Sequence, residues 1–137
     1  MEPTIILYSL LCMFLLSVFI GMRMLQLRFR AVLKDKLHPG YFKLNRGAKL
    51  PDYLVQVTQH YENLYETPVL FYVIVILAYL LKVVDVVTIS LAYGYVVTRI
   101  IHAVIHITRN KVKYRKNIFL VSIIILTIFW IYVFIKL

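Results

Sequence analysis

The sequence predicts an all-α integral membrane protein, a single domain over residues 1–137 built as a bundle of four transmembrane helices. Three observations predict this fold class. Hydrophobic residues make up 62% of the 137 residues and the mean hydropathy is +0.82, which leaves too little polar surface for a water-soluble domain. Apolar stretches long enough to cross a bilayer recur along the chain. Lys and Arg residues gather in two of the segments that connect these stretches.

The first helix is expected over residues 4–33. Residues 5–22 are uncharged, a run long enough to span the membrane and longer than the apolar core of a signal peptide, so we expect it to be retained. Residues 24–30 contain no helix breaker and continue the helix as a basic extension. Cys12, the single cysteine, excludes an intrachain disulfide and is expected to pack as a small hydrophobic residue.

The second helix is expected over residues 51–83. Pro51 and Asp52 favour its start, because proline fits the first turn and a carboxylate is stabilised by the positive end of the helix dipole. At ~1.5 Å per residue the helix is longer than the bilayer is thick, so its first third should project into the cytoplasm. Pro68 is expected to kink it just after Glu66.

The third and fourth helices are expected over residues 86–110 and 114–136. A tight connection over residues 82–85 joins the second helix to the third. The fourth helix contains the uncharged run 118–135, which is long enough to span the bilayer, and Trp130 near its end suits the membrane interface.

Two charged side chains are expected at membrane depth. The fifteen uncharged residues 67–81 that follow Glu66 are too few to cross ~30 Å of hydrocarbon, and only thirteen uncharged residues precede Arg99 in its helix. Glu66, Arg99 and His102 are separated from the turn that joins the second and third helices by similar numbers of residues. The three side chains should therefore lie at about the same depth in the bilayer. We therefore expect an ion pair or hydrogen bond of Glu66 with Arg99 or His102, which would make both charges tolerable in the bilayer.

Two polar faces are predicted on neighbouring helices. Polar side chains of the second helix share one face at the spacing i, i+4 and i+7: Gln59, Asn63 and Glu66. Polar side chains of the third helix continue this spacing to i+11: Tyr95, Arg99, His102 and His106. Facing each other, they would form a polar seam open to the cytoplasm. A buried network that only fixes helix packing is the alternative.

Other kinds of site find little support. The net charge of +10 would suit nucleic acid, but the cations flank the predicted spans, so no nucleic-acid partner is expected. No metal is expected, because the two histidines of the third helix have no third ligand at helical spacing and no cysteine pair accompanies them. No glycine-rich phosphate loop, nucleophile elbow or hydrolase triad is present. Arginines where the helices leave the bilayer could receive the carboxylates of a ligand, or simply contact lipid headgroups: Arg28, Arg30, Arg109 and Arg115.

Two motifs then carry a resemblance: Asn63-x-x-Glu66-x-Pro68 in the second helix and Arg99-x-x-His102-x-x-x-His106 in the third. With four spans and a basic first loop, they resemble the membrane-associated proteins in eicosanoid and glutathione metabolism (MAPEG), over about residues 23–120 and most clearly over 59–116. The family includes microsomal glutathione transferases, leukotriene C and prostaglandin E synthases, and short bacterial members, which this chain resembles in length. The resemblance implies a homotrimer with glutathione held between subunits.

The same resemblance implies roles for individual residues. The implied glutathione-binding residues are Arg28, Gln59, Asn63, Glu66, His102 and His106, and the implied catalytic residue is Arg115. Glu66 would receive the glutathione amine, Arg115 would stabilise the thiolate, and Arg99 matches a structural arginine.

Three positions depart from the family pattern. Gln59 replaces an arginine, His106 replaces a tyrosine, and Lys116 replaces a small hydroxyl residue. The neutral Gln59 removes a charge-assisted contact of about 1.5 to 3 kcal/mol, which is about one to two decades of affinity for an anionic tripeptide.

Two functions follow from the resemblance. The first is a membrane-embedded glutathione-dependent transferase or peroxidase that acts on a lipophilic electrophile from the bilayer, which Arg115 favours. The second is a non-catalytic MAPEG-like protein that binds a lipid, which Gln59 favours; a small exporter is a weaker third. We expect a multi-pass protein of a bacterial inner membrane, with its active face in the cytoplasm.

The charge pattern predicts the topology. Thirteen Lys and Arg residues follow the first and third spans: Arg23, Arg28, Arg30, Lys34, Lys36, Lys43, Arg46 and Lys49, then Arg109, Lys111, Lys113, Arg115 and Lys116. Only Lys82 and Lys136 flank the spans on the other side, so both termini should be extracytoplasmic. A reporter enzyme that is active only outside the cytoplasm should be active when it is fused to either terminus. Activity at the termini of a reporter that works only in the cytoplasm would contradict this topology.

Overall fold

The computed structural model describes residues 2–44, 49–108 and 111–137. Helices account for most of these residues, and no strand occurs among them: η1 (Pro3–Ile6), α1 (Leu7–Leu33), α2 (Tyr41–Leu44), α3 (Asp52–Asn63), α4 (Thr67–Leu80), α5 (Val86–Ile107) and α6 (Val112–Ile135). Arg46, Arg109 and the expected end of the third helix at residue 110 lie outside the described residues.

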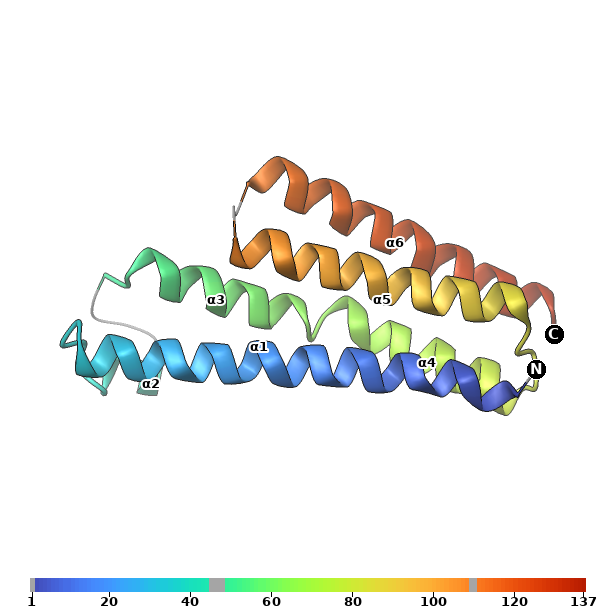
Figure 1. Cartoon of the computed structure of the whole chain (residues 1–137), viewed down its shortest axis with the longest axis horizontal. Coiled ribbons are helices and arrows are strands. Elements are labelled where there is room, and N and C mark those ends of the chain that lie inside the picture. Colours follow the sequence, from blue (N-terminus) through green and yellow to red (C-terminus); the bar gives the residue numbers. More distant parts are fainter. Residues whose placement is uncertain (1, 45–48, 109–110) are drawn as a thin grey trace.

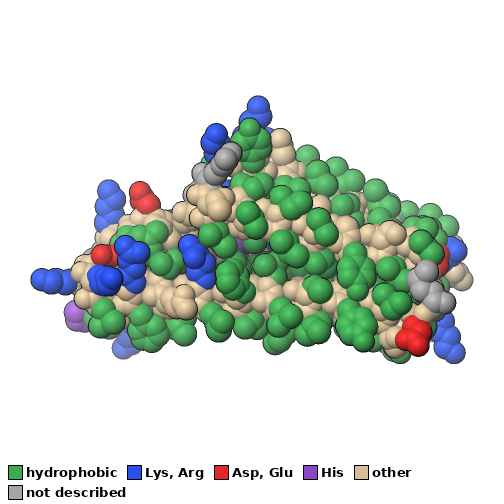
Figure 2. Space-filling view, viewed as in Figure 1, with side chains coloured by type: hydrophobic (Ala, Val, Ile, Leu, Met, Phe, Trp, Pro, Cys, Tyr) green, Lys and Arg blue, Asp and Glu red, His purple; other side chains and the backbone are tan. Residues whose placement is uncertain are grey.

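Four segments are long and apolar enough to cross a membrane: Pro3–Leu33, Asp52–Leu80, Val86–Ile107 and Val112–Ile135. The predicted four-helix membrane bundle is therefore confirmed. The N and C labels lie at the same end of the bundle, and the start of α3 lies at the other (Figure 1). On the face shown in Figure 2, hydrophobic side chains cover most of the bundle. Lys and Arg gather at the end that holds α2 and around the beginning of α6. We call the end of the bundle opposite the two termini, where α2 lies and α6 begins, the basic end.

The second span is two helices rather than one. α3 ends at Asn63 and α4 begins at Thr67, so the single helix expected over residues 51–83 is divided where a kink was expected (Figure 1). Pro68 has no N–H to donate to the carbonyl four residues back, and its ring crowds that carbonyl. The N–H groups of Leu64 and Tyr65 instead bond to carbonyls three residues back, at 3.1 and 2.9 Å.

The apolar core lies between this break and the chain termini. Its centre is a stacked pair of fully buried rings, Phe71 of α4 and Tyr95 of α5, with centroids 4.5 Å apart. Met13 of α1 and Phe129 of α6 are fully buried in the same cluster. On the other side of the break, smaller apolar clusters around Ile20 and Leu54 flank a group of buried polar side chains, and this group is where the candidate site lies.

α5 and α6 are tied together beside the termini through Asp85. Its side chain caps α5 by accepting the Thr88 N–H at 2.9 Å, and it also accepts the Tyr132 hydroxyl at 2.6 Å. Lys136 completes the cluster at 3.3 Å. Partial burial raises the pKa of the Asp85 carboxyl, but the hydrogen bonds from Tyr132 and Thr88 and the pairing with Lys136 outweigh this effect and lower the pKa to about 2.

The lowered pKa of Asp85 predicts a pH-dependent effect of Asp85→Asn. Asparagine can still cap α5, so the variant should lose only the charged contacts, and the loss should be small because the pair with Lys136 is exposed. Because the pKa is lowered from 3.8 in the folded state, this stabilisation is present above that pH and is lost as the pH falls toward about 2. Thermal unfolding in detergent should show a difference from wild type at pH 7 that shrinks on acidification; a constant difference would contradict the prediction.

Candidate functional site

The site is built around the buried guanidinium of Arg99. This side chain of α5 is 1% exposed, and its Nη2 donates a hydrogen bond to the backbone oxygen of Asn63 at 3.0 Å. In an unbroken helix that oxygen would accept the N–H four residues on, but the break after α3 leaves it available. The guanidinium also lies 5.5 Å from the ring centroid of Phe119 on α6. Arg99 thus connects α5 to the break in the second span and to α6.

The direct ion pair or hydrogen bond predicted for Glu66 does not form. Among the described residues, Glu66 makes no ion pair with Arg99 and no hydrogen bond with His102, although its charge lies near enough to interact with the Arg99 guanidinium. The Glu66 side chain is exposed. The prediction counted levels along one continuous helix. Because the chain leaves the helix after Asn63, the side of the span on which Glu66 lies no longer follows from its spacing to Asn63.

Three buried histidines lie beside Arg99, nearer the basic end. His60 of α3 and His106 of α5 stack with ring centroids 4.4 Å apart, and His102 lies 6.1 and 5.9 Å from them. They are 2%, 1% and 4% exposed. The Nε2 atom of each is buried without a hydrogen-bond partner in the protomer, which is uncommon for a buried polar group. Within the described ranges, no group of His, Cys, Asp or Glu residues is arranged to hold a metal ion.

A pocket of about 380 Å³ opens on one side of the histidines, between α3, α5 and α6. We call it the α3/α5/α6 pocket. Its lining residues are Gln59, Asn63, His102, Val112, Arg115, Lys116 and Phe119. The structure therefore brings together Gln59, Asn63, His102 and Arg115, four of the residues singled out from the sequence.

The remaining three predicted site residues lie elsewhere. Glu66 is exposed, and His106 lines a different pocket. Arg28 lies on α1 with its guanidinium 5.2 Å from the ring centroid of Phe42. Its Nε is buried without a hydrogen-bond partner. The chain thus does not bring the whole predicted set into one pocket.

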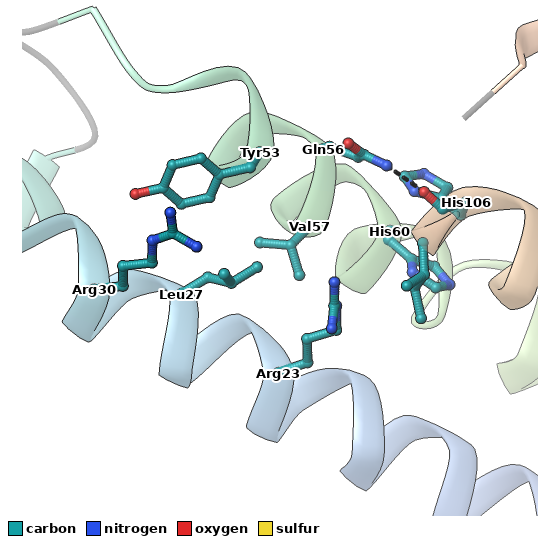
Figure 3. Close-up of a pocket in the computed structure, with 9 residues that line it drawn as sticks. Arg23, Leu27, Arg30, Tyr53, Gln56, Val57, His60 and His106 are labelled. Atoms are coloured by element: carbon teal, nitrogen blue, oxygen red, sulfur yellow. Dashed lines mark hydrogen bonds between the residues drawn. The ribbon is translucent and has the colours of Figure 1, made fainter. Parts of the chain in front are cut away.

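The second pocket, of about 340 Å³, lies between α1, α3 and α5 (Figure 3). We call it the α1/α3/α5 pocket. Its lining residues are Arg23, Leu27, Arg30, Tyr53, Gln56, Val57, His60, His106 and Ile107. The Gln56 amide donates a hydrogen bond to the backbone oxygen of His106, drawn as a dashed line in Figure 3, and so joins α3 to the end of α5.

Sequence reasoning did not select Arg23, Gln56 or His60. For His60 the sequence did contain a signal. Leu54, Val57 and His60 follow one another at intervals of three residues and form the buried stripe of α3. A histidine in an otherwise apolar inward stripe indicates a polar interior. The pocket itself depends on how α1 and α3 pack, which spacing along one helix does not predict.

An apolar groove of about 620 Å³ lies on the outer side of α1, against α3 and α4. Phe14 and Val18 contribute from α1, and Tyr61, Tyr65 and Val69 from the second span. The hydroxyls of Tyr61 and Tyr65 lie 2.8 Å apart. Such a groove can hold an acyl chain or another lipophilic molecule.

The α3/α5/α6 pocket combines the cations of Arg115 and Lys116 with hydrogen-bonding groups on Gln59, Asn63 and His102. A guanidinium beside a bound thiol favours its thiolate form. The pocket is thus suited to an anionic ligand that carries a nucleophile.

Comparison with known proteins identifies one family. The family model described as MAPEG family matches residues 5–135 of the 137. No curated protein and no solved structure matches the chain.

The Arg99 hydrogen bond predicts the effect of Arg99→Met. Methionine fills much of the same space but leaves the Asn63 oxygen without its donor, which should lower the free energy of unfolding by about 1 to 3 kcal/mol. Arg99→Lys, which keeps a donor, should be milder. Thermal unfolding in detergent, followed by circular dichroism, measures both; unchanged stability of Arg99→Met would show that this contact does not hold the break in place.

Proposed function

Because the chain belongs to the MAPEG family, we propose that it is a membrane-embedded glutathione-dependent transferase or peroxidase that acts on a lipophilic electrophile. The observation that carries this proposal is the α3/α5/α6 pocket, where Arg115 lies beside Gln59, Asn63 and His102. These residues come from three helices, and the resemblance assigns all four to a thiol site.

In the proposed reaction, Arg115 stabilises the thiolate of bound glutathione. In conjugation the thiolate sulfur attacks an electrophilic carbon, and the carbon–sulfur bond forms as the bond to the leaving group breaks and the leaving group departs with its electron pair. In peroxide reduction the sulfur attacks one peroxide oxygen, the oxygen–oxygen bond breaks, and the other oxygen leaves as the alcohol after taking up a proton. The sulfenic acid formed on the first glutathione then reacts with a second glutathione to give the disulfide and water. Asn63 and His102 orient the tripeptide by hydrogen bonds. Phe119 and the outer apolar groove offer surfaces along which a lipophilic substrate can approach from the bilayer.

We further propose a homotrimer with the thiol site facing the cytoplasm. Support comes from two of the three predicted ligands that lie outside the α3/α5/α6 pocket, Glu66 and Arg28. Glu66 exposes a carboxylate near the middle of a span, where a charge is costly unless a partner faces it. A neighbouring subunit or the glutathione amine would supply that partner.

A non-catalytic lipid-binding protein of the same family is the alternative. Two observations favour it: Gln59 is neutral where the family carries a cation, and the apolar groove of about 620 Å³ is the larger cavity. In that case the polar seam fixes the helices and the groove holds the ligand.

The transferase proposal predicts opposite effects of two arginine variants. Arg115→Ala should abolish thiolate formation while leaving glutathione bound, because the cation acts mainly on the charged sulfur. Arg28→Ala should instead weaken binding. Ultraviolet thiolate absorbance, together with equilibrium binding of glutathione to the detergent-solubilised protein, separates the two effects.

The matched gain-of-function variant is Gln59→Arg. It adds the cation that Gln59 lacks in the α3/α5/α6 pocket. The affinity for glutathione should rise by about ten- to a hundredfold. If wild type forms no thiolate and Gln59→Arg gains no affinity, the enzyme proposal fails and the lipid-binding alternative replaces it.

A further inference from the structure

The α1/α3/α5 pocket has no role in the proposed thiol chemistry. It lies on the other side of the α3–α5 packing from the α3/α5/α6 pocket, and the two share no lining residue. We propose that it is a second binding site, for an oxyanion of the phosphate type, carried either by a lipid headgroup or by a soluble phosphate.

The charge of the pocket is the first argument. Arg23 and Arg30 lie seven residues apart on one face of α1, and none of the described residues that line the pocket is acidic. In Figure 3, Arg23 extends from α1 toward α3, on the side of Val57 and His60. Arg30 lies with its guanidinium 5.3 Å from the ring centroid of Tyr53. The nearby carboxylate of Asp35 accepts the Tyr53 hydroxyl.

The buried imidazoles are the second argument. His60 and His106 are 2% and 1% exposed, and the Nε2 atom of each lacks a hydrogen-bond partner in the protomer. The two rings stack in parallel, 11° apart, and both line the pocket. A buried polar atom without a partner is costly, and an oxyanion in the pocket could accept a hydrogen bond from each ring.

The size and surroundings of the pocket favour a phosphate. A guanidinium matches the geometry of phosphate oxygens, and about 340 Å³ is at the small end of ligand sites. Leu27, Val57 and Ile107 give the pocket an apolar wall. Anionic headgroups concentrate where basic residues leave a membrane, so a lipid phosphate and a soluble phosphate can both reach this end of the bundle.

The test compares three probes on the delipidated full-length protein in detergent: phosphatidic acid, phosphatidylcholine with the same acyl chains, and inorganic phosphate. Arg23→Gln should weaken binding of the phosphate-bearing probe by about ten- to a hundredfold, as expected for loss of a hydrogen bond from a charged donor. Lys34→Gln is the control, because it removes a positive charge of an exposed residue at the end of the same helix that does not line the pocket. It should weaken binding much less.

The outcomes separate the sources of the ligand. Binding of phosphatidic acid but not of inorganic phosphate identifies a lipid site, whereas displacement of the lipid by inorganic phosphate shows that the oxyanion alone suffices. Equal losses for Arg23→Gln and Lys34→Gln would mean general attraction to a basic surface and would overturn the proposal. Failure of the thiolate experiment would leave this result unaffected, because Arg115 takes no part in it.

Wild-type protein provides a second, independent measurement. Histidine side-chain NMR should show that the bound probe shifts the ring resonances of His60 and His106. His38 is exposed, and its Nδ1 accepts a hydrogen bond from the backbone N–H of Gly40. It serves as the internal control, and its ring resonances should not shift. If Arg23→Gln does not fold, the NMR measurement on wild type is the test. Resonances of His60 and His106 that stay unshifted in the presence of each probe would overturn the proposal.

Discussion

The hydrogen bond from Arg99 to the Asn63 backbone oxygen is the contact on which the arrangement of the two polar pockets depends. Pro68 prevents the second span from continuing as one helix, and the break leaves a carbonyl without its usual donor. Arg99 supplies the donor from α5, so the break can lie inside an apolar environment. With the end of α3 held against α5, Gln59 and Asn63 face one pocket while Gln56 and His60 face the other.

Much of the fold could be predicted because its determinants are local. Apolar runs of spanning length and the placement of Lys and Arg are visible in the sequence, and the structure has the four spans they predict. Glu66 shows where this reasoning ends. Its depth follows from counting residues, but its side of the helix depends on the backbone after Asn63, which periodicity treats as regular.

The candidate site was partly predictable for the same reason. Gln59 and Asn63 lie on α3 before the break, so they keep the spacing that puts both on one face, and both line the α3/α5/α6 pocket with His102 and Arg115. His106 belongs to the same face of α5 as His102, but α3 packs between the two pockets and separates them. Arg23 and His60 acquire their setting only from the packing of α1 against α3, which no single-helix pattern contains.

The division of the second span also bears on how the protein fits its membrane. A straight helix answers a change in bilayer thickness by tilting as a whole, which costs packing along its full length. Here α4 packs in the apolar core, whereas α3 is held to α5 by the hydrogen bonds of Arg99 with Asn63 and of Gln56 with His106. A tilt of α4 with bilayer thickness would have to pass through the turn at residues 64–66 before it reached α3, a wall of both pockets. The break therefore separates the half of the span that fits the bilayer from the half that shapes the pockets.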